Sequence, residues 1–163
     1  MRGPFFVDGL EVGAVGTCPK PPGGAELRLA LEELALQADI LVSLLGPREI
    51  HDAGLEQEGR IAAELGMEYF EHPIGDLRVP TDEQALIDLA ARIADKVRGG
   101  KRLVAHCWMG IGRATLLAGS VLVHLGWSGE QAIEAISSVR GVRVPDNATQ
   151  RDWLLSLPAR LQR

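Results

Sequence analysis

Short apolar runs alternate with longer amphipathic segments along most of the chain. Residues 39–45, 67–74 and 101–106 each contain several apolar side chains and have the length of β-strands. The first of these runs is almost continuously apolar and ends at a Gly-Pro pair, which is typical of a strand buried on both faces of a parallel sheet. Near the N-terminus, residues 5–7 and 10–15 have the pattern of two short strands joined by an Asp-Gly turn.

The segments between and after these runs carry apolar residues at helical spacing. Helices are expected over about residues 25–38, 55–65, 81–97, 113–125 and 129–139, with a last one from about residue 147. Thr81 with Gln84 forms a predicted capping box, and Ser128 is a predicted N-cap. Strands that alternate with helices of this length predict an α/β fold, with a central, mostly parallel sheet flanked by helices on both faces.

The composition is that of a globular domain. Of the 163 residues, 46% are apolar and 24% charged, which excludes a disordered tail, a collagen-like repeat and a disulfide-dense miniprotein. We expect one domain over residues 1–163, acting as a monomer. The net charge of −5 argues against a nucleic-acid or membrane partner.

Neither a membrane span nor a secretory signal is expected. The longest apolar stretch, residues 116–125, is too short to cross a bilayer, and Asp8 interrupts the apolar residues near the N-terminus. The two cysteines, Cys18 and Cys107, are too few for a disulfide framework, so a reducing cytoplasm is the expected compartment.

One of these cysteines follows the strand predicted over residues 101–106 and precedes the helix predicted from Arg113. The five residues between Cys107 and Arg113 are able to curl so that successive backbone N–H groups face inward and bind an anion. Gly110 and Gly112 permit this curl without placing a side chain in the concave, anion-binding face of the loop, here called the bowl. Arg113 is able to bind two phosphate oxygens, and the positive field favours the nucleophilic thiolate of Cys107.

The same residues taken singly have ordinary explanations. Cys107 alone is equally well explained as a buried structural cysteine, but the preceding His106, the glycines and Arg113 together favour a phosphate-binding loop. We expect His106 to support the loop by hydrogen bonds rather than to carry protons.

A proton donor is predicted in the loop of residues 74–80. Asp76 precedes Cys107 by 31 residues, with one helix and one strand between them. Adjacent parallel strands in a βαβ unit would bring both loops to the same sheet edge. An aspartate in such a loop often only forms a turn, but with the cysteine loop downstream we expect a general acid.

The motifs HCWMGIGR and PIGDLRVP resemble the Cys-x5-Arg phosphate loop and the general-acid loop of the cysteine-dependent protein phosphatases. The similarity is closest to the dual-specificity branch and, within it, to the kinase-associated phosphatase group. It covers about residues 39–157, including segments 130–133, 139–141 and 149–150.

The resemblance implies a metal-independent, cofactor-free phosphatase acting through a phosphocysteine intermediate. Cys107 would attack phosphorus, and Asp76 would protonate the leaving oxygen and then activate water. The resemblance assigns binding of the phosphoryl oxygens to the backbone amides of the loop and the Arg113 side chain. The loop residues are Trp108, Met109, Gly110, Ile111, Gly112 and Arg113.

Two supporting roles remain open at this stage. Similarity makes Gln150 a candidate for positioning the water, whereas its spacing from Asn147 equally predicts an exposed residue in a helix-capping box. Glu49 is a candidate ion-pair partner of Arg113 or an ordinary solvent-facing carboxylate.

The sequence departs from the family pattern immediately after the arginine. The family usually has Ser or Thr there, whose hydroxyl helps the thiolate leave, but this chain has Ala114, with Thr115 one place later. Because a helix turns by about 100° per residue, Thr115 should not point at the sulfur. We therefore expect slow hydrolysis of the intermediate.

The remaining candidates have weaker patterns. Cys18, expected in a loop, is either a resolving thiol for oxidised Cys107 or, more simply, a passive residue. His51, His72 and His124 show no metal-ligand spacing, so no metal is expected.

The substrate is less well defined than the chemistry. The bulky, neutral Trp108, Met109 and Ile111 disfavour a polyphosphorylated inositol and favour a phosphorylated protein or a small phosphomonoester. A lipid phosphomonoester and a weakly active phosphate-binding module remain alternatives. The loop of residues 74–80 that carries the expected general acid Asp76, called the acid loop below, argues against a rhodanese-like sulfurtransferase or an arsenate reductase, because neither needs a general acid there.

Overall fold

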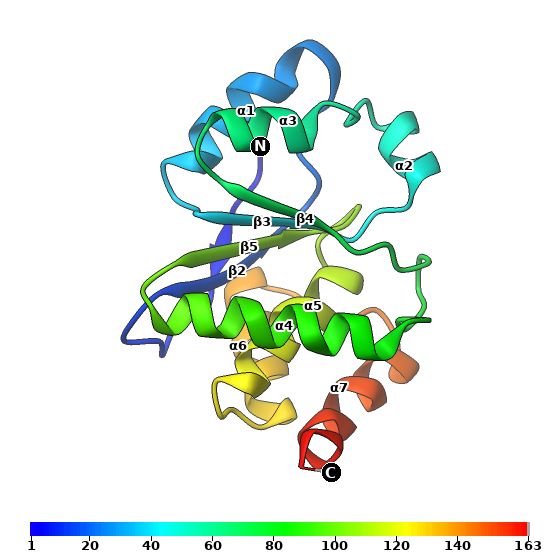
Figure 1. The fold of residues 1–163 in the computed structure, drawn as a ribbon. Coiled ribbons are helices and arrows are strands. Elements are labelled where there is room, and N and C mark those ends of the chain that lie inside the picture. The colour runs from blue at the N-terminus through cyan, green and yellow to red at the C-terminus, as the bar shows by residue number, and fades with distance from the viewer. Residues whose placement is uncertain (163) are drawn as a thin grey trace.

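The structure of the protein is a computed structural model that describes residues 1–162. Five strands form one sheet in the order β1-β2-β5-β3-β4 (Figure 1). Their bounds are β1 Phe5–Phe6, β2 Ala14–Cys18, β3 Ile40–Ser43, β4 Glu68–Glu71 and β5 Arg102–His106. Strand β1 pairs with β2 in antiparallel orientation. The other four strands, β2, β5, β3 and β4, run parallel to one another.

Helices cover both faces of this sheet. They are α1 Leu27–Ala35, α2 Pro47–Asp52, α3 Glu58–Glu64, α4 Glu83–Arg98, α5 Arg113–His124, α6 Gly129–Arg140 and α7 Ala148–Leu161, with a 3₁₀ turn at Gly24–Glu26. Helices α1 and α3 lie on one face, and α4, α5 and α6 lie on the other (Figure 1). The predicted α/β architecture is confirmed. Within residues 1–162, no helix combines the length and apolar character needed to cross a membrane.

The sequence pattern located most elements, and the differences have local causes. The second strand begins at Ala14 rather than residue 10 and extends to Cys18, because it pairs with β5 over that length. Helix α4 is capped by the Asp82 side chain, which accepts a hydrogen bond from the Ala85 N–H, and not by Thr81. The predicted Ser128 cap is confirmed. Helix α2 had not been predicted.

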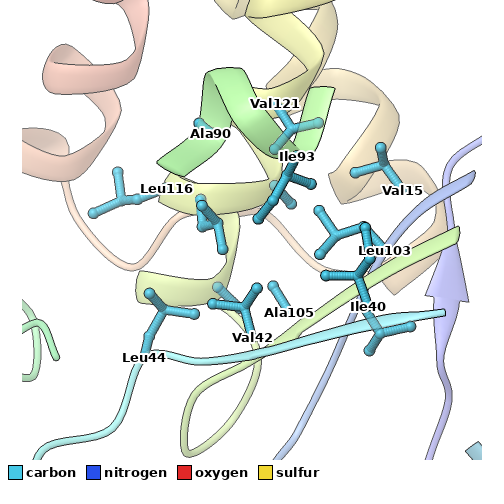
Figure 2. Packing of buried hydrophobic residues seen from close by; sticks show 14 of the residues in the cluster. Val15, Ile40, Val42, Leu44, Ala90, Ile93, Leu103, Ala105, Leu116 and Val121 are labelled. Carbon is cyan, nitrogen blue, oxygen red and sulfur yellow. The ribbon is translucent and has the colours of Figure 1, made fainter. Parts of the chain in front are cut away.

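The apolar core lies between the sheet and the helices. Side chains of the central strands, such as Val42 and Ala105, face Ile93 of α4 and Leu116 and Val121 of α5 (Figure 2). All five are fully buried. Because burial of one aliphatic side chain stabilises a fold by about 1.5–3 kcal/mol, this layer holds the central strands rigidly. The loops that leave their carboxyl ends therefore start from fixed positions.

Candidate active site

Two loops and a short helix bring polar side chains together at one edge of the sheet. Cys107 directly follows β5, Asp76 lies in the loop after β4, and Glu49 lies in α2, after β3. These strands are parallel, so their carboxyl ends share this edge. A cavity of about 310 Å³ opens there, lined by Glu49, Asp76, Leu77, Cys107, Trp108, Met109, Gly112, Arg113 and Asp146.

The first three carbonyl groups of the loop of residues 107–112 point outward. Three successive carbonyl oxygens accept hydrogen bonds from groups outside the loop: that of Cys107 from His106 Nδ1 (3.2 Å), that of Trp108 from the Lys20 N–H (3.1 Å) and that of Met109 from Arg140 Nη2 (3.0 Å). In a planar trans peptide the N–H points opposite to the C=O, so the following amides face the bowl. Inward N–H groups of this kind bind anions.

The curl of this loop depends on a glycine. Gly110 has φ +73°, and a Cβ atom on it would lie 2.3 Å from the carbonyl oxygen of Cys18. Both the backbone angle and this close approach exclude a side chain. The end of β2 therefore supports the phosphate loop from behind.

Arg113, the first residue of α5, is only 2% exposed and lies against the bowl. Its Nη1 and Nη2 donate to the two carboxylate oxygens of Glu49 (2.8 and 2.9 Å), and Nη1 also donates to the Ile74 carbonyl (3.0 Å). Glu49 is therefore the ion-pair partner of Arg113 and not an ordinary solvent-facing carboxylate. This bidentate pair holds the guanidinium plane in one orientation.

The electrostatics of this pair follow from its contacts. Hydrogen bonds from Arg113 hold the pKa of Glu49 below its usual value. Burial opposes the charge on Arg113, but Glu49, Cys107 and Asp76 outweigh it and raise the pKa of Arg113. The guanidinium is therefore a permanent cation at the bowl.

Asp76 approaches the same arginine from the loop after β4. Its Oδ1 lies 3.4 Å from Arg113 Nη2, although its side chain remains 68% exposed. The next residue, Leu77, has φ +63°, a conformation that costs a non-glycine residue of order 1–3 kcal/mol. Strain of this kind persists where surrounding contacts enforce it.

Those contacts come from the N-cap and the first turn of α7. Asn147 Nδ2 donates to the Leu77 carbonyl (2.8 Å), and Gln150 Nε2 donates to the Arg78 carbonyl (3.0 Å). Gln150 is fully buried, so the interpretation of it as an exposed capping residue is wrong. Its N–H does donate to the Asn147 side chain, but its own amide group fastens the acid loop.

His106 is held by a buried carboxylate that sequence reasoning missed. Its Nε2 lies 2.9 Å from both carboxylate oxygens of Glu58, and Glu58 also accepts a hydrogen bond from the Tyr69 hydroxyl (2.9 Å). His106 and Glu58 are 0% and 1% exposed. Because Nδ1 donates to the Cys107 carbonyl, this network fixes the start of the phosphate loop. Nothing in the sequence pattern distinguished Glu58 as a partner of His106, because its spacing is that of an ordinary polar residue on a helix.

The first turn of α5 offers the Cys107 sulfur no side-chain hydroxyl. Ala114 is fully buried and has no hydroxyl, and the buried Thr115 Oγ1 makes no hydrogen bond within residues 1–162. The interpretation that Thr115 does not replace the missing hydroxyl agrees with this geometry.

Cys18 lies in a strand and not in the expected loop. It ends β2, pairs in register with His106 and is fully buried as a free thiol. Burial above all, and the nearby Glu58, raise the pKa of the Cys18 thiol well above its usual range. Cys18 is therefore a poor nucleophile in the folded protein.

Metal-binding geometry is not found among residues 1–162, where no group of three or more His, Cys, Asp or Glu side chains could hold an ion. His51 lies 3.3 Å from Glu56 on the surface. His72 and His124 are half-buried, and burial lowers the pKa of each. None of them lines the cavity at the sheet edge.

A cysteine and an arginine in a strand–loop–helix bowl, with an acid loop beside them, are the features of the protein tyrosine phosphatase class, and solved structures agree. Kinase associated phosphatase is similar with a TM-score of 0.80 and 20% identity, over 91% of this chain and 88% of that chain. The active form of Tk-PTP has a TM-score of 0.74 and 26% identity, over 96% and 97%. PTPMT1 in complex with PI(5)P has a TM-score of 0.70 and 19% identity, over 93% and 92%.

The particular family follows from the sequence. Residues 31–127 match the family described as "Polymorphic toxin system, DSP-PTPase phosphatase", Tc-R-P, and the chain belongs to this family. No curated protein matches it by sequence. The predicted class, a cysteine-dependent phosphatase of the dual-specificity branch, is confirmed, and the chain is a protein tyrosine or dual-specificity phosphatase.

Proposed function

We propose that this enzyme hydrolyses phosphomonoesters with Cys107 as the nucleophile, Arg113 and the loop amides as the phosphate-binding groups and Asp76 as the general acid. One observation carries the proposal: Cys107, Arg113 and Asp76 line one cavity, and the outward carbonyls of residues 107–109 turn the following amides into it. Nucleophile, anion site and proton donor are the three parts that phosphoryl transfer through a covalent intermediate requires.

The first step forms a bond between the Cys107 sulfur and phosphorus while the phosphorus–oxygen bond to the leaving group breaks. Asp76 donates its proton to that oxygen, so an alcohol or phenol departs. The phosphoryl oxygens bind the amides of residues 108–113 and the Arg113 guanidinium, whose orientation Glu49 fixes. These donors are already in place before the reaction, so no reorganisation is needed.

In the second step water attacks phosphorus, the sulfur–phosphorus bond breaks and its electrons return to Cys107 as thiolate. The carboxylate of Asp76 takes a proton from the water. Gln150 acts as a positioning residue, because its buried amide fixes the acid loop through the Arg78 carbonyl.

The proposed substrates are phosphorylated side chains of proteins. Three exposed apolar residues stand around the cavity beside the carboxylates of Asp76 and Asp146: Leu77 is 57%, Met109 60% and Trp108 39% exposed. Such a rim suits an aromatic or aliphatic phosphoresidue in a peptide better than a highly charged inositol head group. The complex of PTPMT1 with PI(5)P keeps a phosphoinositide as the second candidate.

A substrate panel tests this choice. We expect the full chain to hydrolyse phosphotyrosine peptides faster than phosphoinositides, and to show no thiosulfate:cyanide sulfurtransferase activity. The Asp76→Ala variant should retain bound phosphopeptide, because the anion site remains while proton donation is lost. Faster hydrolysis of a phosphoinositide than of any phosphopeptide would contradict the proposed substrate class.

The missing hydroxyl at position 114 predicts a burst with a chromogenic aryl phosphate. Release of the phenol should be fast in the first turnover and slow afterwards, because no hydroxyl at position 114 donates a hydrogen bond to the departing thiolate. Ala114→Ser should raise the steady-state rate about tenfold, the effect of one hydrogen bond of about 1.5 kcal/mol to a charged group.

The matched control for this comparison is Ala118→Ser, which adds the same hydroxyl one turn later in α5. It should leave both phases unchanged. A parent without a burst, combined with unchanged turnover in Ala114→Ser, would contradict the role assigned to position 114.

We further propose that one monomeric catalytic domain carries this activity in the cytoplasm. Site and core draw on strands from β2 to β5 and on helices from α2 to α7, so they form one unit. A free Cys107 thiol needs a reducing compartment.

A further inference from the structure

A third carboxylate, besides those of Glu49 and Asp76, borders the active-site cavity. Asp146 lies in the segment between α6 and α7 and lines the same cavity as Cys107, Asp76 and Arg113. A Cβ atom on Gly112 would lie 2.1 Å from Asp146 Oδ2, so this oxygen packs directly against the backbone of the phosphate loop. No motif marked Asp146, because it precedes the α7 cap as an ordinary loop residue.

Two contacts hold Asp146 in this position. Its N–H donates to Gln150 Oε1 (3.1 Å), and Gln150 in turn donates to the Arg78 carbonyl of the acid loop. The neighbouring Asn147 donates to the Leu77 carbonyl. The segment carrying Asp146 and the loop carrying Asp76 are therefore fastened to each other at two points, with one carboxylate on each.

The charged groups around Asp146 come from several elements. On the cavity side they are Glu49, Asp76, Cys107 and Arg113, and in an adjoining hollow of about 360 Å³ they are Arg143 and Arg151. Burial, followed by the charge of Asp76, raises the pKa of Asp146, against the opposing effect of Arg113. Asp146 thus keeps its proton to higher pH than a free aspartate does.

We propose that Asp146 is a second catalytic carboxylate of this enzyme, which carries protons between solvent, substrate and water in parallel with Asp76. The inference rests on the function proposed above. It explains why a cavity that already holds one acid places another carboxylate against the phosphate loop.

The carboxyl group, of Asp76 or of Asp146, that donates a proton in the first chemical step regains one in the second. When the phosphorus–oxygen bond of the substrate breaks, either protonated carboxyl group supplies the proton of the departing alcohol and becomes a carboxylate. When water then attacks the phosphocysteine, the same carboxylate takes the proton of the water, and the sulfur leaves as thiolate. Each turnover therefore restores the donor.

The test compares Asp146→Asn, Asp76→Asn and the double variant on two aryl phosphates, p-nitrophenyl phosphate and phenyl phosphate. The phenolate of the second leaves poorly and needs a proton donor. Asp146→Asn should slow phenol release in the first turnover about tenfold for phenyl phosphate and less for p-nitrophenyl phosphate, because only the first chemical step depends on the leaving group. The double variant should be at least about tenfold slower than Asp76→Asn on phenyl phosphate.

The pH profile gives a further readout that a structural role would not move. An acid catalyst works while protonated, so activity falls as pH rises through its pKa. Removing a carboxyl group whose pKa is raised should therefore shift the basic limb of kcat/KM to lower pH. Asp152→Asn, the same change at an exposed position of α7, should leave rates and profile unchanged.

Two results would separate the possible failures. If Asp146→Asn matches Asp152→Asn in rate, leaving-group dependence and pH profile, and the double variant equals Asp76→Asn, Asp146 has no catalytic role. Cys107→Ser, run beside them, tests the underlying function: hydrolysis that persists in this variant would contradict the cysteine mechanism itself.

Discussion

Replacing Cys107 with serine is expected to lower kcat on an aryl phosphate by at least about 10⁴-fold, since loss of a covalent nucleophile has effects of this size or larger. The change is almost isosteric, so the bowl and Arg113 should remain. A serine hydroxyl, however, stays protonated at neutral pH and is a far weaker nucleophile than a thiolate. Steady-state hydrolysis checks the rate, and calorimetric binding of a phosphopeptide checks that the anion site has survived.

The other cysteine is the matched control. Cys18 lies behind the phosphate loop, at the end of β2, and its thiol does not line the cavity. Cys18→Ala should therefore retain hydrolysis. If Cys18→Ala removed activity while Cys107→Ser kept it, the nucleophile would have been assigned to the wrong residue.

Replacing Arg113 with lysine is expected to lower kcat by about 10²- to 10³-fold, the usual effect of losing one preorganised donor to the transition state. The positive charge is kept, but an ammonium group lacks the planar pair of N–H donors. It cannot contact Glu49 at both oxygens, as Arg113 does at 2.8 and 2.9 Å, and at the same time bind two phosphoryl oxygens. The measurement is kcat and KM for the same aryl phosphate.

The chain contains a second arginine in a bidentate ion pair, and its replacement by lysine is the control for Arg113→Lys. Arg102, at the opposite end of β5, makes a bidentate pair with Asp39 through Nε and Nη2 (3.0 and 3.1 Å) but lies away from the cavity. Arg102→Lys loses the same kind of pair and should leave kcat unchanged. Equal losses in both variants would mean that Arg113 acts on stability and not on phosphate.

The sequence predicted the parts of the site that lie at fixed distances along the chain. The loop from Cys107 to Arg113 is local, because a buried strand, two glycines and a helix start together dictate its curl. Asp76 was predictable because one βαβ unit connects it to that loop. The expectation that the two strands of this unit are adjacent was wrong, since β3 lies between β4 and β5, but all three run parallel and end at the same edge. The central strands were equally predictable from the sequence, since continuous apolar runs mark strands buried on both faces.

Residues brought in by tertiary packing were not predictable in this way. Glu58 and Asp146 have no distinctive spacing, and their roles arise only where α3 meets His106 and where the α6–α7 segment meets Gly112. Gln150 had two interpretations from the sequence, a residue that positions the water and an exposed residue of a helix-capping box. Its burial excludes the exposed residue, and a single sequence does not report burial of a polar side chain.

The most direct test of the central claim is chemical capture of the intermediate. The full chain is mixed with an aryl phosphate, quenched within the first turnover, and its peptides are analysed by mass spectrometry. The account predicts a phosphoryl group on the peptide containing Cys107, more abundant in the parent than in Ala114→Ser, where hydrolysis of the intermediate is faster. Phosphate release with no adduct on Cys107 in either protein, together with undiminished activity of Cys107→Ser, would contradict it.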